Sequence, residues 1–159
     1  MKKWVGILVI AVAGIFVAVK IKNRFVMAEL PLAQTSFLRT DGSRLNTTSL
    51  SGKYLIISCF QSWCGDCIRE APSIAELQEF AGKEKLEVVM VSDEDWAKIN
   101  RFAALLKCDL PMYQSGKSFD ELGIRVYPST WLLNPEGKIL LAKLEGFNWN
   151  SDEVKQLIQ

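Results

Sequence analysis

Residues 54–67 read YLIISCFQSWCGDC, an apolar run that leads directly into a Trp-Cys-x-x-Cys motif. Because residues 54–60 are almost all apolar, we expect a strand that is buried on both faces, as in the centre of a parallel sheet. A helix is expected to begin at the motif. The unpaired N–H groups and the dipole of a helix N-terminus stabilise a thiolate and lower the pKa of the first cysteine. The stretch therefore predicts a strand, a reactive dithiol and a helix in succession.

The two cysteines of the motif have different expected roles. Cys64 is the candidate nucleophile, and Cys67, about one helical turn deeper on the same face, is the candidate resolving thiol that attacks a mixed disulfide at Cys64. Zinc sites share this spacing, but they need four ligands, and the chain has no histidine and no second CxxC. We therefore expect no metal and no cofactor. Cys59 and Cys108 are interpreted as buried thiols, with a second disulfide left open.

Composition limits the classes of function. The chain has 159 residues, of which 49% are hydrophobic and 23% charged, and a formal net charge of +1, which suits one globular domain with a core. The sequence shows no basic stripe with interleaved aromatic residues, so no nucleic-acid partner is expected. The absence of histidine removes the usual general base and most metal chemistry.

The N-terminal part of the chain has the pattern of a membrane anchor. Residues 4–19 carry no charge and are flanked by basic residues on both sides. As a helix they would span ~24 Å, less than the ~30 Å hydrocarbon core, but the flanking lysines can snorkel. We expect a transmembrane anchor at 1–24, a linker at 25–34 and a globular domain at 35–159. A signal peptide that is cleaved near residues 26–28 is the alternative.

The rest of the chain alternates strand and helix patterns. This alternation predicts an α/β fold with a mixed sheet sandwiched by helices and an N-terminal β-hairpin. Pro72 should kink the helix that follows the motif. The other expected elements are a hairpin at 36–46, a strand at 87–92, helices at 95–107 and 117–122, an antiparallel pair at 129–133 and 138–142, and a last helix capped by Ser151.

In this order of elements, residues 32–159 resemble the thioredoxin superfamily. Within it, the chain is most similar to the membrane-anchored, periplasm-facing thioredoxins of the TlpA/ResA type, some of which serve cytochrome c maturation. The residues that carry the resemblance are Gly52-Lys53 before the strand, the motif at 63–67, Glu70, Pro72, and the segments 127–130 (YPST) and 134–138 (NPEGK).

The resemblance implies roles for several residues. Pro128 would be a cis-proline that faces the dithiol, and the backbone at Tyr127 would pair with an extended client segment, so that Trp63, Tyr127 and Pro128 form the candidate client-binding set. Glu70 matches an acidic residue that these proteins carry near the dithiol. It could move the proton of Cys67, or it could form only a surface ion pair with a basic neighbour.

Three positions depart from the pattern of the superfamily. Ser58 stands where typical thioredoxins keep a buried aspartate, which leaves Glu70 as the only local acid for proton transfer. Asp66 replaces the proline that is usual between the two cysteines. Tyr127 is larger than the Thr or Val that often precedes the cis-proline.

The resemblance implies a thiol–disulfide oxidoreductase. It would be a single-pass inner-membrane protein with its catalytic domain in the periplasm, receiving electrons from a membrane donor and reducing disulfides of client proteins. The alternatives are a peroxiredoxin-like peroxidase and a copper-delivery module. The first would need a peroxidatic cysteine with Thr and Arg in a Pro-rich loop, and the second a distal His or Met ligand; neither pattern appears.

Overall fold

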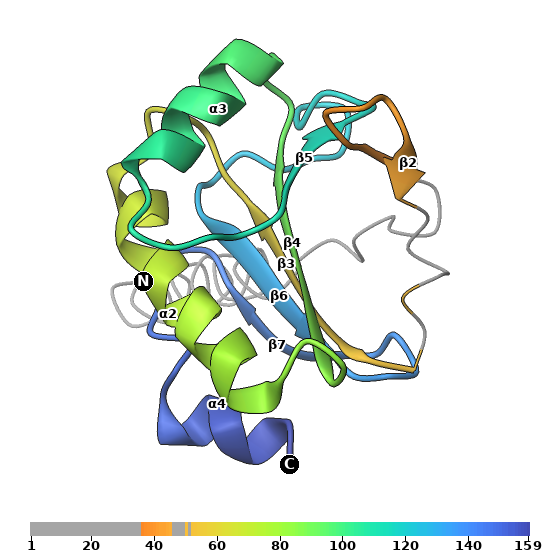
Figure 1. Cartoon of the computed structure of the whole chain (residues 1–159), viewed down its shortest axis with the longest axis vertical. Coiled ribbons are helices and arrows are strands. Elements are labelled where there is room, and N and C mark those ends of the chain that lie inside the picture. The colour runs from red at the N-terminus through yellow and green to blue at the C-terminus, as the bar shows by residue number, and fades with distance from the viewer. Residues whose placement is uncertain (1–35, 46–49, 51) are drawn as a thin grey trace, which may run out of the picture. The chain divides into compact units, whose positions relative to one another are not determined.

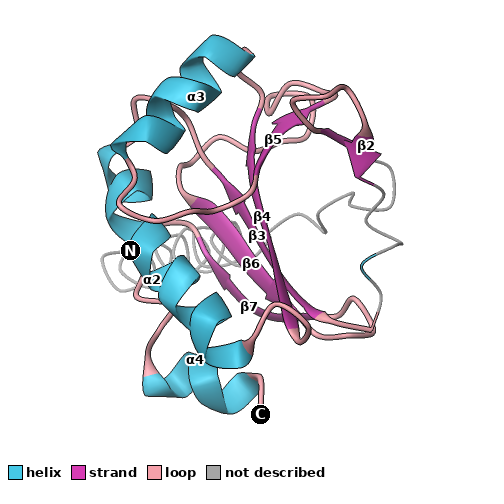
Figure 2. Cartoon of the chain, viewed as in Figure 1, coloured by secondary structure: helices cyan, strands magenta, loops and turns pink. Residues whose placement is uncertain are grey.

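The computed structural model describes residues 36–45, 50 and 52–159 (Figure 1). Its described part contains a seven-stranded mixed sheet and three helices (Figure 2). The predicted anchor at 1–24 and linker at 25–34 lie outside the described residues. Within the described ranges, no helix combines the length and the apolar character that crossing a membrane requires.

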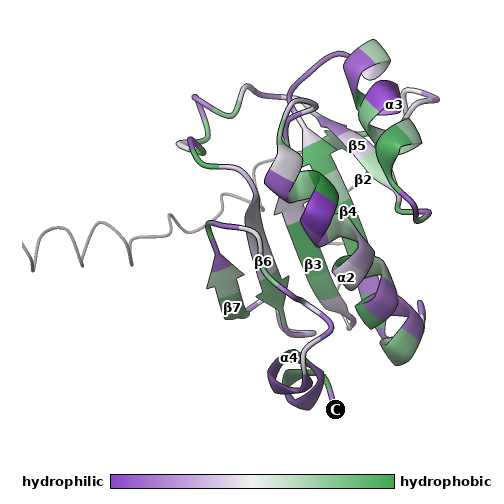
Figure 3. Cartoon of the chain, turned by 90° about the vertical axis from the view of Figure 1, so that its left-hand side faces the viewer, coloured by the Kyte–Doolittle hydropathy of each residue, from purple (hydrophilic) through white to green (hydrophobic). Residues whose placement is uncertain are grey.

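The predicted buried strand lies next to the middle of the sheet, in the order β2-β1-β5-β4-β3-β6-β7. This strand, β3 (Tyr54–Cys59), pairs in parallel with β4 (Leu86–Ser92) and antiparallel with β6 (Ser129–Leu133). Side chains on both faces of β3 and β4 are buried, and both strands are coloured mainly as hydrophobic in Figure 3. The near-continuous apolar run is explained by this two-sided burial.

The edges of the sheet are formed by short antiparallel strands. At one edge β7 (Ile139–Lys143) pairs with β6, as predicted. At the other edge β1 (Phe37–Leu38) and β2 (Arg44–Leu45) form the predicted hairpin, which turns at Gly42 with a φ of +78°. Between this hairpin and β4 lies β5 (Met112–Ser115), which the sequence analysis did not predict.

The three described helices pack on one face of the sheet. They are α2 (Gly65–Ala81), α3 (Trp96–Leu105) and α4 (Asp152–Leu157). Apolar side chains of all three share one buried cluster with side chains of β3, β4 and β6. The prediction of a sheet sandwiched by helices therefore holds, among the described elements, for one face only.

Two further local predictions need correction. Residues 117–122 form turns instead of a helix, although the Leu122 N–H bonds the Ser118 carbonyl as it would in a helix. The helix after the motif runs through Pro72 as one element, so the expected interruption there is wrong, while the kink stays a prediction. The last helix begins as expected, with the Ser151 side chain accepting the backbone N–H of Val154.

Candidate functional site

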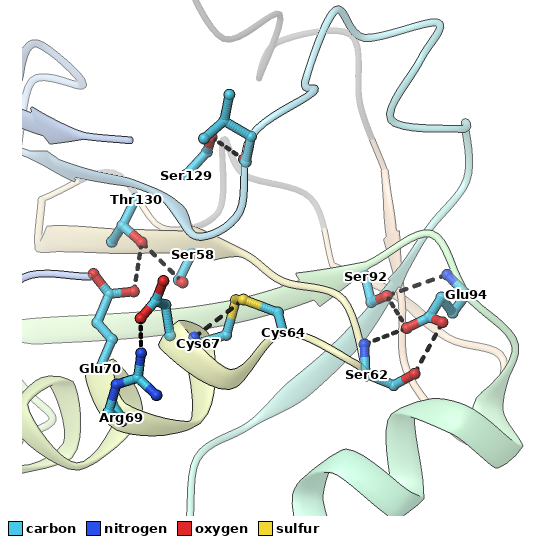
Figure 4. Close-up of a disulfide and its surroundings, with 12 residues drawn as sticks. Ser58, Ser62, Cys64, Cys67, Arg69, Glu70, Ser92, Glu94, Ser129 and Thr130 are labelled. Atoms are coloured by element: carbon cyan, nitrogen blue, oxygen red, sulfur yellow. Dashed lines mark hydrogen bonds and ion pairs between the residues drawn. A yellow bond between two sulfur atoms is a disulfide. The ribbon is translucent and has the colours of Figure 1, made fainter. Parts of the chain in front are cut away.

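The two motif cysteines are joined by a disulfide at the N-terminus of α2 (Figure 4). Their Cα atoms are 5.3 Å apart. Cys64 is the N-cap residue of the helix, and its Sγ accepts the backbone N–H of Cys67 at 3.1 Å. The same N–H group and the helix dipole would stabilise a thiolate at Cys64 in the reduced protein. In the disulfide form, the exposed fraction is 5% for Cys64 and 1% for Cys67.

Glu70 is buried behind the dithiol, with only 2% of its surface exposed. It lies three positions after Cys67, so the two side chains lie on the same face of α2. Burial raises the pKa of Glu70 to about 7, although several hydrogen bonds counteract part of this rise. The alternative of a surface ion pair is thus excluded. The basic neighbours pair elsewhere, Arg69 with Asp66 and Lys53 with Glu87.

Both oxygens of the Glu70 carboxylate receive hydrogen bonds from buried donors. Trp149 Nε1 donates to Oε1 at 2.6 Å, and Thr130 Oγ1 lies 3.0 Å from Oε2. Thr130 Oγ1 is also 2.9 Å from the Oγ of Ser58. A hydroxyl carries one proton, so Thr130 can donate to Glu70 while it accepts from Ser58. Ser58 thus contributes a hydrogen bond to the network where a typical thioredoxin has an acid.

Trp149 was missed by the sequence analysis. It is fully buried, and it reaches Glu70 across 79 positions of the chain. Phe147 packs edge-on against it, with ring centroids 5.3 Å apart. The only local signal was a tryptophan just before the Ser151 cap, and such a pattern does not reveal its partner.

The candidate client-binding residues lie together beside the dithiol. The Tyr127–Pro128 peptide bond is cis, as the resemblance implied. Trp63 is 72% exposed, and its ring meets that of Tyr127 edge-on, with centroids 5.8 Å apart. The Tyr127 ring also packs against that of Phe119, with centroids 5.7 Å apart. Trp63 is therefore the exposed member of an aromatic group next to the cis-proline, in which Tyr127 is partly buried and Phe119 is buried.

Two consecutive acids that follow β4 connect the loops around this aromatic group. Asp93 accepts a hydrogen bond from Gln61 Nε2 at 2.6 Å and from the backbone N–H of Phe119 at 2.7 Å. Glu94 accepts the backbone N–H of Ser62 at 2.5 Å and the Ser62 hydroxyl at 2.9 Å (Figure 4). Asp93 therefore ties the loop before the dithiol to the loop before the cis-proline. The sequence analysis did not identify either acid.

The remaining cysteines are not paired. Cys59 is buried in β3, and its burial raises its pKa. Cys108 is partly buried, which raises its pKa as well. The open alternative of a second disulfide is therefore wrong for this structure, and both thiols are in environments that disfavour the reactive thiolate.

Comparisons with known proteins agree with the fold. The sequence profile of the AhpC/TSA family matches residues 23–142. Thiol-disulfide oxidoreductase ResA of Bacillus subtilis is 26% identical over 104 residues, which are 64% of this chain and 58% of ResA, less than two thirds of its length. The thioredoxin-like protein YneN of the same organism is 24% identical over 152 residues, 87% of this chain and 88% of YneN.

A solved structure shows the same thioredoxin-like fold. It is that of a putative thiol:disulfide interchange protein DsbE from Chlorobium tepidum, with a TM-score of 0.67 and 19% identity. The similarity covers 79% of this chain and 92% of the DsbE chain. At this level of identity the comparison supports the fold alone.

Proposed function

The chain belongs to the AhpC/TSA family, and we propose that it is a thiol–disulfide oxidoreductase that reduces disulfide bonds of client proteins. One observation carries the proposal: Cys64 and Cys67 form a disulfide at the N-terminus of α2. Such a pair can give two electrons to another disulfide and can be reduced again by a dithiol donor. The names of the relatives, which are a thiol-disulfide oxidoreductase and a thioredoxin-like protein, support the same class of activity.

In the first step the thiolate of Cys64 attacks one sulfur of the client disulfide. A mixed disulfide forms between Cys64 and the client, and the second client sulfur leaves as a thiolate that takes a proton from water. The Cys67 N–H group that now bonds the Cys64 Sγ at 3.1 Å would stabilise the attacking thiolate. Cys64 is also the more exposed of the two cysteines.

In the second step Cys67 must lose its proton before it can attack. Glu70 lies on the same helix face, and with a pKa of about 7 its carboxylate can accept this proton near neutral pH. The Cys67 thiolate then attacks the Sγ of Cys64, which releases the client as a second thiolate and forms the disulfide. The client gains two electrons, and the dithiol loses two.

The surface beside the dithiol suits an extended client segment. The cis bond before Pro128 places the backbone of Tyr127 at the end of β6, where a client strand can bind partly through its main chain. The exposed Trp63 offers an apolar contact for the client side chains. This arrangement favours a protein or peptide client over a small disulfide.

The proposal also concerns the compartment in which the domain lies and the donor that reduces its disulfide again. We infer an uncleaved anchor at 1–24 that keeps the domain in the periplasm, close to a membrane-borne electron donor. The charge-free run at 4–19 supports the anchor. Alkaline phosphatase fused after Gln159 should therefore be active. An inactive fusion, together with an active cytoplasmic reporter at the same position, would reverse the topology.

The decisive test is a covalent trap. In Cys67→Ser the nucleophile remains, but the mixed disulfide cannot be resolved, so clients should accumulate on Cys64. Envelope extracts are separated by non-reducing electrophoresis, and the bands are identified by mass spectrometry, with Cys64→Ser as the matched control. Identical band patterns in the two variants would contradict the proposal. An apocytochrome among the trapped clients would assign the chain to cytochrome c maturation.

A further inference from the structure

Gln61 is a buried polar residue in the loop between β3 and α2, and the proposed reaction steps do not use it. It lies three positions before Cys64, and 7% of its surface is exposed. Its backbone oxygen accepts the backbone N–H of Cys64 at 2.9 Å, so the main chain of Gln61 fixes the nucleophile directly. The amide side chain is buried as well, and buried amides need hydrogen-bond partners, because an unpaired polar group in the interior costs free energy.

The Gln61 amide bonds a carboxylate whose two oxygens are both used. Nε2 donates to Oδ1 of Asp93 at 2.6 Å, and Oδ2 of Asp93 accepts the backbone N–H of Phe119 at 2.7 Å. An ionised carboxylate only accepts hydrogen bonds, so the nitrogen and not the oxygen of the amide must face Asp93. Hydrogen bonds to charged acceptors are also stronger than those between neutral groups. Asp93 therefore fixes the orientation of the amide relative to the loop that carries Phe119.

The same amide contacts the hydroxyl of Tyr127. Burial raises the pKa of Tyr127, and a hydrogen bond with the Gln61 side chain lowers it in part. A primary amide has two N–H groups, so one can donate to Asp93 while the other donates to the Tyr127 oxygen. The Tyr127 hydroxyl in turn donates to the backbone oxygen of Ile124 at 3.2 Å. The side chain of Gln61 is thus shared between the acid after β4 and the residue before the cis-proline.

The residue after Gln61 is held in a similar way by the next acid. Glu94 accepts both the backbone N–H and the hydroxyl of Ser62 (Figure 4). The Glu94 side chain is largely buried, with 9% of its surface exposed. Residues 61 and 62 are therefore both anchored to the segment after β4, immediately before Trp63 and Cys64. Neither residue can shift without breaking a hydrogen bond to a carboxylate.

We propose that Gln61 is a positioning residue that sets the place of the Cys64 nucleophile relative to the client-docking residue Tyr127. The inference rests on the proposed reduction of client disulfides, because only a docked client gains from this alignment. The backbone of Gln61 holds Cys64, and its amide holds Tyr127. One residue therefore connects the attacking sulfur with the place at which the client binds. Such alignment matters for the rate, since a displacement of about 1 Å at the reacting atoms can lower it about a hundredfold.

The experiment compares two disulfides as oxidants of the reduced protein. The first is an extended peptide disulfide with a fluorophore and a quencher on its two halves. The second is hydroxyethyl disulfide, which has no peptide backbone to dock beside Tyr127. Gln61→Met keeps the length of the side chain and the backbone oxygen but removes the amide. It should lower the single-turnover rate with the peptide several-fold, even at saturating peptide, and leave the rate with hydroxyethyl disulfide unchanged.

Two further variants make the result specific to this connection. Gln114→Met is the matched control, because it removes an amide that donates to the backbone oxygen of Glu94 at 2.9 Å, and it should keep the wild-type ratio of the two rates. Tyr127→Phe removes the hydroxyl that Gln61 contacts and keeps the ring, so it tests the same contact whether or not Gln61→Met folds. It should lower the peptide rate selectively. Combining it with Gln61→Met should cause little further loss, as expected for two groups that act as one unit.

The positioning role would be overturned by a wild-type ratio of the two rates in Gln61→Met or in Tyr127→Phe. It would also be overturned by an equal loss of rate with both disulfides, or by losses that add in the combined variant. A wild-type protein that does not reduce the peptide disulfide would instead refute the proposed function, so the two failures are distinguishable.

Discussion

Trp149→Phe should raise the pKa of Glu70 above its present value of about 7. The substitution removes the Nε1 donor that lies 2.6 Å from Oε1 of the carboxylate, and both partners are buried. A hydrogen bond to a charged group contributes about 1.5 to 3 kcal/mol, and one pKa unit corresponds to about 1.4 kcal/mol. We therefore expect the pKa of Glu70 to rise by about one to two units.

The assay is a titration of the Glu70 side chain in the oxidised protein by carbon NMR, with the carboxyl carbon labelled and Glu70→Gln used for assignment. Phe147→Leu is the matched control, because it loosens the packing around the Trp149 ring but leaves the Nε1 donor in place. The pH midpoint of the rate at which Cys64 and Cys67 form their disulfide in a single turnover with a peptide disulfide should move upward together with the pKa of Glu70. In a Glu70→Gln background, Trp149→Phe should leave the pH profile unchanged.

An unchanged or lower pKa in Trp149→Phe would refute the reasoning, because a donor to the carboxylate can only favour the charged form. An equal rise in Phe147→Leu would also refute it, since the effect would then come from packing. Each variant must first give native circular dichroism. If the pKa of Glu70 rises in Trp149→Phe and not in Phe147→Leu, Trp149 is a positioning residue for Glu70, and its effect is seen in the pH profile as well as in stability.

Three further predictions concern single substitutions. Burial raises the pKa of Glu70 from 4.5 to about 7, so the folded state binds a proton more tightly than the unfolded state. Urea titrations should therefore show the wild-type free energy of unfolding falling by about 3 kcal/mol as the pH rises from 4.5 to 7, relative to Glu70→Gln. Parallel curves for the two proteins would contradict this. Asp66→Pro should lower the pKa of the Cys64 thiol in thiolate absorbance titrations, since it removes a half-exposed negative charge near the thiolate. A rise, or no fall, would count against this explanation. Asp93→Asn should lower the free energy of unfolding by about 1 to 3 kcal/mol, because two loops lose a charged hydrogen-bond acceptor. It should also raise the KM for a peptide disulfide used as the client. Unchanged values of both quantities would show that the connection between the loops has no effect.

Local patterns were sufficient to predict the centre of the fold and the dithiol. The apolar run of β3, the motif and the amphipathic pattern of α3 each predict their structure from a few adjacent residues. The strand β5 was missed because its four residues, MYQS, alternate in burial over too short a stretch to form a recognisable pattern. The helix expected at 117–122 was wrong although Ser118 and Glu121 make the reciprocal hydrogen bonds of a helix N-terminus, so a start signal alone did not extend into a helix.

The proton-handling part of the site could be predicted only in part. Glu70 was identified by resemblance, but the donors that hold its carboxylate come from distant parts of the chain. Thr130 and Trp149 are 60 and 79 positions away from it. Asp93 bonds Gln61 across 32 positions. Such contacts depend on how the strands are ordered in the sheet, which no short segment of the sequence specifies.

The 79 positions that separate Trp149 from Glu70 in the sequence have a consequence for when the site is complete. The dithiol and its helix are complete by residue 81, but the indole that completes the hydrogen bonding of Glu70 belongs to the last eleven residues of the chain. A chain that ends before Trp149 would thus have both thiols but would lack the indole N–H that favours the ionised form of Glu70. A chain clipped before Trp149 should therefore still form the disulfide but resolve a mixed disulfide with a client more slowly.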